Sequence, residues 1–111
     1  MQKAVDALDK DFKKSDILVY GAGNFFHRNN AEMQRKYNIK AIIDKNKEGI
    51  LEDWKIIKIS ECSNIAYEQI VIMVENVGVC FSIIRDLMDC GIESEKIIWG
   101  GGYFWNICGQ I

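Results

Sequence analysis

The chain has 111 residues, of which 49% are hydrophobic and 27% charged, a balance that excludes a disordered polypeptide and predicts one domain over residues 1–111. Its formal net charge of −2 excludes a strongly basic surface for nucleic acid. No apolar run approaches the roughly 18 residues of a membrane-spanning helix, and the first residues lack the apolar core of a signal peptide, so we expect a cytoplasmic protein without membrane insertion.

Helical and strand patterns alternate along the chain. Apolar residues that recur every three or four positions, as Val5, Leu8 and Phe12 do, predict amphipathic helices. Short continuous apolar runs predict strands buried on both faces. In chain order we expect a helix at 1–14, a strand at 17–20, a helix at 24–37, a strand at 39–43, a loop at 47–49, a small strand at 54–59, an ambiguous segment at 60–67, a strand at 70–74, a helix at 79–88 and a strand at 96–99.

This alternation predicts an α/β fold, a Rossmann-like open parallel sheet of four or five strands with helices on both faces. With the strands numbered along the chain, the expected order is 3-2-1-4, with the first and last strands as neighbours. The point where the strand order reverses, at which sheets of this class bind ligands, then lies beside Gly21.

A Gly-x-Gly motif, Gly21-Ala22-Gly23, joins the first strand to the following helix. The first glycine permits the tight turn, the second lets a phosphate approach the backbone, and the helix N-terminus offers unpaired N–H groups. Asp44 ends the next strand, near the offset of about twenty residues at which an acid binds a ribose hydroxyl. The pattern favours a nucleotide-like ligand, and a tight turn without a ligand is the alternative.

Phe26 departs from this pattern, because it stands where Gly-x-Gly-x-x-Gly has its third glycine. That glycine lets the helix pack closely on the sheet. We therefore expect Phe26 to push the helix outward or to cover the ligand cleft, which argues most against NAD.

The candidate ligand-binding residues lie at the expected strand ends. They are Gly21, Ala22, Gly23, Asn24, Phe25, Asp44, Lys45, Glu75 and Asn76. Lys45 either meets an extra phosphate, as on NADP or coenzyme A, or belongs to a solvated loop. Asn76 either lines the cleft or caps the next helix.

The sequence assigns no catalytic residue and no metal ligand. It contains no Tyr-x-x-x-Lys, phosphate-binding P-loop or Gly-x-Ser-x-Gly motif. The cysteines form no Cys-x-x-Cys pair, and the single His27 has no cysteine at zinc-finger spacing, so we expect reduced cysteines in the core and no metal site. Three aromatic residues at 103–105 either fold back over the sheet or dock on a second subunit.

The runs at 19–24 and 41–46, Val-Tyr-Gly-Ala-Gly-Asn and Ala-Ile-Ile-Asp-Lys-Asn, resemble the small Rossmann domains of bacterial surface-polysaccharide biosynthesis. Such domains occur at the N-terminus of sugar O-acyltransferases and in nucleotide-sugar dehydratases. The resemblance covers roughly residues 15 to 100 and implies a domain that holds a nucleotide-sugar, NAD or a related ligand. The family's ligand contacts carry over to Gly21, Gly23 and Asp44.

We therefore expect a nucleotide- or nucleotide-sugar-binding domain, with a UDP-sugar or NAD(P) as ligand and no catalysis of its own. Its chemistry would come from a catalytic domain elsewhere, and a homodimer is a further candidate partner. The alternatives are a structural or dimerisation module with an empty cleft, and a small transferase that uses the same cleft.

Overall fold

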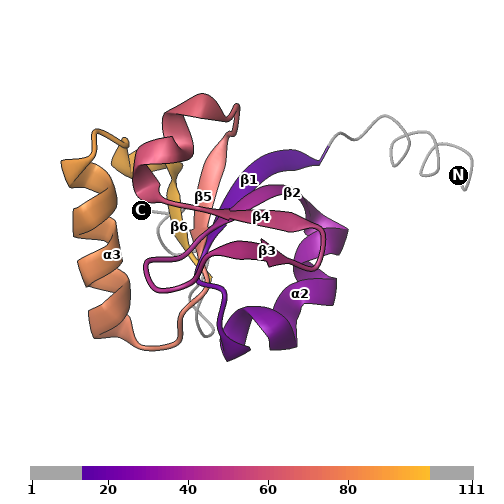
Figure 1. Cartoon of the computed structure of the whole chain (residues 1–111). Helices are drawn as coiled ribbons and strands as arrows, with labels where there is room; N and C mark the ends of the chain where they lie inside the picture. Colours follow the sequence, from indigo (N-terminus) through magenta and orange to yellow (C-terminus); the bar gives the residue numbers. More distant parts are fainter. Residues whose placement is uncertain (1–13, 101–111) are drawn as a thin grey trace, which may run out of the picture.

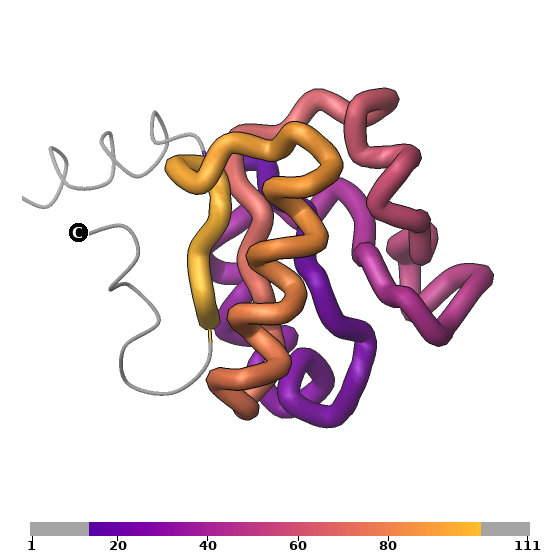
Figure 2. The backbone as a smooth tube through the Cα atoms, turned by 90° about the vertical axis from the view of Figure 1, so that its left-hand side faces the viewer, coloured from indigo at the N-terminus to yellow at the C-terminus, as the bar shows by residue number. Residues whose placement is uncertain are grey.

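Six strands form one sheet in the computed structural model, which describes residues 14–100. The elements in chain order are β1 (Ser15–Tyr20), α2 (Asn24–Lys36), β2 (Tyr37–Ile43), β3 (Gly49–Leu51), β4 (Trp54–Ile57), the 3-10 helix η1 (Ile59–Asn64), β5 (Gln69–Ile72), α3 (Val77–Asp89), the 3-10 helix η2 (Ser94–Lys96) and β6 (Ile97–Trp99). Figure 1 shows α2 and α3 on opposite sides of the sheet, and Figure 2 shows α3 in front of it. The α/β class and the Rossmann-like layering are confirmed.

The sheet order is β3-β4-β2-β1-β5-β6, and every pairing is parallel except that of β3 with β4. The order 3-2-1-4 therefore holds for the first four parallel strands, with β6 added at the end. The expectation that the first and last strands are neighbours is wrong. Because β5 already pairs with β1 on the side away from β2, β6 can extend the sheet only beyond β5.

Alternating side chains of the central strands fill two separate cores. In β1, Leu18 and Tyr20 pack on the side of α3, whereas Ile17 and Val19 pack on the side of α2. All four are at most 5% exposed, which explains why this strand reads as a continuous apolar run.

Some local expectations need correction. The expected loop at 47–49 is shorter, because Gly49 already begins β3, which pairs with β4 as an antiparallel hairpin. The 3-10 helix η1 begins at Ile59 and covers the first part of the ambiguous segment at 60–67. Cys62 and Cys80 are buried as expected, but Cys90 is exposed. The expected helix at 1–14 lies outside the described residues except at its last position, and so do the aromatic residues at 103–105 and Cys108.

Helix α3 begins two residues earlier than expected, at Val77, because Asn76 caps it. The Asn76 Oδ1 accepts a hydrogen bond from the Val79 N–H at 3.0 Å.

We expect Asn76→Ala to lower the free energy of unfolding by about 1 kcal/mol and Asn76→Ser to retain most of that stability, because serine is also a good N-cap residue. Urea denaturation of both variants measures this difference, and equal losses would contradict the capping role.

Candidate functional site

The turn after β1 is held between the ends of β2 and β5. Gly21 has φ +112°, and its N–H donates to the Ile43 carbonyl at 2.8 Å. A Cβ at this position would lie 2.9 Å from the Met73 carbonyl oxygen. Both the backbone conformation and the close approach of β5 therefore require glycine here.

Gly23 leaves open space at the N-terminus of α2. It is the N-cap residue, with φ −96° and ψ −162°, and a Cβ built on it would meet nothing within 4 Å. No side chain caps α2 by a hydrogen bond, and its first turn contains no acidic residue. A helix N-terminus with this arrangement is suited to an anion such as a phosphate.

Asp44 organises the glycine turn from the end of β2. Its Oδ2 accepts from the Ala22 N–H at 2.9 Å, and its Oδ1 accepts from the N–H groups of Asn46 and Lys47 at 2.8 and 3.0 Å. The Lys47 ammonium donates to the Ala22 carbonyl at 3.0 Å. A carboxylate offers about four acceptor positions. Three are occupied by the backbone, so Asp44 acts mainly as a structural clamp on the turn.

Two adjoining cavities, of about 260 and 290 Å³, lie beside the strand ends on the α3 side of the sheet. Both are lined by Tyr20, Asp44, Lys45 and Asp86. The first is completed by Ile43, Lys58 and Ile59, and the second by Gly21, Asn46, Val74, Val79, Ser82 and Ile83. We call this region the α3 groove.

The structure brings some of the predicted residues together and leaves others apart. Gly21, Asp44 and Lys45 line the α3 groove, and Ala22 is bound to Asp44. Gly23, Asn24 and Phe25 lead into α2, whereas Glu75 and Asn76 line neither cavity of the groove.

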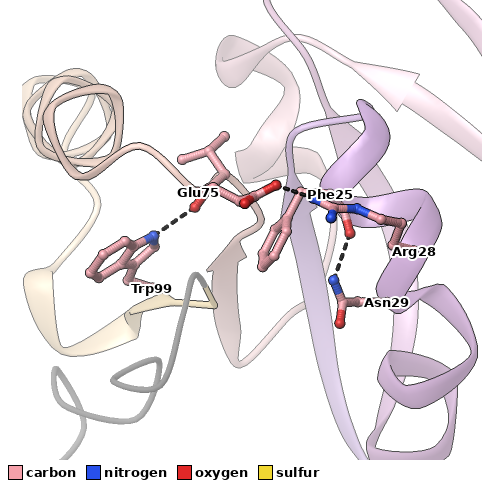
Figure 3. A network of polar contacts seen from close by, with 6 residues as sticks. Phe25, Arg28, Asn29, Glu75 and Trp99 are labelled. Atoms are coloured by element: carbon pink, nitrogen blue, oxygen red, sulfur yellow. Dashed lines mark hydrogen bonds and ion pairs between the residues drawn. The ribbon is translucent and has the colours of Figure 1, made fainter.

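Glu75 instead forms an ion pair with Arg28 of α2 (Figure 3). The Arg28 guanidinium lies over the ring of Phe25, 5.7 Å from its centre. On the other side of this loop, the Trp99 indole N–H donates to the Val74 carbonyl at 2.8 Å. These contacts link α2, the loop after β5 and β6 at the edge of the sheet.

Sequence reasoning missed Tyr20, Ser82 and Asp86. Tyr20 directly precedes the glycine motif, but its apolar neighbours made it read as a core residue. Ser82 and Asp86 stand four positions apart on α3, a spacing that places both on one helix face. That spacing was the available signal, although it does not reveal which cavity the face lines.

The expectation that Phe26 covers the ligand cleft is wrong. Phe26 is fully buried in the core beneath α2 and lines neither cavity of the α3 groove. Its ring packs edge-on against Trp54, with ring centres 5.8 Å apart. Trp54 belongs to the hairpin strand β4, which provides the partner for the large side chain.

Metal and membrane features were sought in residues 14–100. No group of three or more His, Cys, Asp or Glu side chains there is arranged to hold a metal ion. Within the same residues, no helix has both the length and the apolar character needed to cross a membrane.

The sequence model of one protein family, described as C2185-like, N-terminal, matches residues 13–98. No curated protein matches the chain.

Similar solved structures include RSP, a Rex-family repressor, with a TM-score of 0.59 and 14% identity over 98% of this chain. A structure of RSP in complex with beta-NADH matches 97% of this chain, with a TM-score of 0.56 and 15% identity. This chain spans 64% and 61% of the RSP chains in those two structures, which is less than two thirds of their length. At this identity the likeness establishes the shared fold.

Proposed function

This chain belongs to the C2185-like, N-terminal family, and we propose that it binds a nucleotide with a pyrophosphate, of the NAD(H) class, at the carboxyl edge of its sheet. The observation that carries the proposal is the uncapped N-terminus of α2, with open space at Gly23. A pyrophosphate there would accept hydrogen bonds from first-turn N–H groups and would gain from the helix dipole.

Two further observations support the proposal. Phe26 is packed in the core and lines neither cavity of the α3 groove, so it does not cover the groove. A solved structure of the same fold holds beta-NADH. The chain covers 61% of that protein, so repression is no part of our proposal.

We assign binding and not catalysis to this domain, with any chemistry supplied by another domain or protein. A nucleotide-sugar is the second candidate ligand. It rests on the resemblance of residues 19–24 and 41–46 to domains of surface-polysaccharide biosynthesis, and no matching protein here adds support for that pathway.

Thermal melts of the purified chain test the proposal, with NADH, NADPH, ADP and UDP-glucose as ligands and adenosine as the control without phosphate. A ligand at about 100 times its Kd adds roughly 2.7 kcal/mol to the free energy of unfolding. That should raise the melting midpoint by several degrees. We expect a shift with NADH and none with adenosine. A shift with UDP-glucose alone would select the nucleotide-sugar, and unchanged melts would favour the structural module.

A further inference from the structure

Tyr20 presents an unused hydroxyl group to the α3 groove. Its side chain is only 5% exposed and lines both cavities. Among the described residues, no side chain or backbone group forms a hydrogen bond with this hydroxyl. No fully buried side-chain nitrogen or oxygen among those residues lacks a partner, so the unpartnered hydroxyl oxygen is not fully buried. The hydroxyl oxygen therefore opens into the groove, where a bound molecule can reach it.

Asp86 presents an unused carboxylate to the same groove. It is half-buried on α3 and lines both cavities, and its carboxylate forms no hydrogen bond or ion pair with the described residues. Asp44 differs, because three backbone N–H groups already occupy its carboxylate. Asp86 is thus the carboxylate in this groove with the larger unused capacity for accepting hydrogen bonds.

The Tyr20 phenol stays protonated and can donate. Burial raises its pKa first, and the nearby carboxylates of Asp86 and Asp44 raise it further. A phenol that donates and accepts, beside a carboxylate that only accepts, suits a neutral group with several O–H donors. Two lysine side chains also line the groove. The Lys58 Nζ lies 3.7 Å from the Glu48 Oε1 and is paired with that carboxylate, whereas Lys45 is exposed.

We propose that Tyr20 and Asp86 form a sugar-hydroxyl subsite, and that Asp86 selects a ligand with an unphosphorylated ribose there. The inference rests on the proposed function and changes its residue assignment. The hydroxyl acceptor is Asp86 on α3, and Asp44 holds the glycine turn. A phosphate monoester beside Asp86 would face the carboxylates of Asp86 and Asp44, with the exposed Lys45 and the Glu48-paired Lys58 as opposing cations, and should bind more weakly there.

Fluorescence titrations with NADH and NADPH test this subsite in the whole chain. Loss of a hydrogen bond to a charged group costs at least about tenfold in affinity. We expect wild type to prefer NADH by at least about tenfold, and Asp86→Asn to reduce that preference several-fold by removing the repulsion of the extra phosphate. Tyr20→Phe should weaken NADH by about two- to tenfold, because it keeps the buried ring but removes a neutral hydroxyl.

Asp89→Asn is the matched control, since Asp89 is exposed at the end of α3 and lines neither cavity. Melts without ligand show that each variant is folded. An unchanged NADH preference in Asp86→Asn, or a change in Asp44→Asn alone, would overturn the subsite. Wild-type protein that binds neither nucleotide would instead refute the proposed function, so the two failures are distinguishable.

Discussion

Replacing Gly23 with leucine is expected to abolish stabilisation by NADH while leaving the protein folded. The backbone at Gly23 has φ −96°, which any residue adopts, and a Cβ there meets nothing within 4 Å. The leucine side chain would project into the space that the pyrophosphate needs. The variant should lose the full contribution of about 2.7 kcal/mol that NADH adds at 100 times its Kd.

Thermal melts of wild type and Gly23→Leu, each with and without NADH, measure this effect. Without ligand, Gly23→Leu should melt a few degrees below wild type, because leucine is a poor N-cap residue, and only wild type should shift upward by several degrees with NADH. Gly23→Ala, with a smaller side chain, should lose less of the shift. Equal shifts in wild type and Gly23→Leu would exclude the turn as the phosphate site.

Replacing Gly21 with alanine is expected to destabilise the protein by about 3 kcal/mol or more. At φ +112° a residue with a Cβ is strained by about 1–3 kcal/mol. The added Cβ would also lie 2.9 Å from the Met73 carbonyl oxygen, and relief requires β5 to move away from β1. Since both strands belong to the centre of the sheet, this movement would disturb both cores.

Gly91→Ala provides the matched control for the backbone strain alone. Gly91 has φ +92°, yet a Cβ there would meet nothing within 4 Å. We expect this control to lose about 1–2 kcal/mol. Urea denaturation gives both free energies of unfolding. Equal losses in the two variants would show that crowding against β5 contributes nothing.

The fold was largely predictable because its signals are local. Buried parallel strands read as continuous apolar runs, as 17–20 does, and Gly21 marks the turn that follows. The position of the last strand was not predictable from alternation. The position of β6 depends on the side of β1 on which β5 pairs, and tertiary packing determines that side.

The site was less predictable, because its decisive contacts join distant residues or involve the backbone. Asp44 was correctly expected beside the glycine turn. The hydrogen bonds that its carboxylate accepts from the backbone N–H groups of Ala22, Asn46 and Lys47 could not be predicted, however, because every residue except proline has such a group. Likewise, the direction of Phe26 depends on Trp54, which lies in a hairpin strand far along the chain.

A titration of the ¹⁵N-labelled chain with NADH, followed by amide NMR spectra, tests the central claim most directly. Nucleotide binding at the carboxyl edge predicts shifts of the amides of residues 20–26, 44–47 and 82–86, which form the turn, the clamp and the α3 groove. Unchanged spectra would contradict the claim. So would shifts confined to the separate cavity at Cys62, Tyr67 and Cys90, which lies apart from the glycine turn.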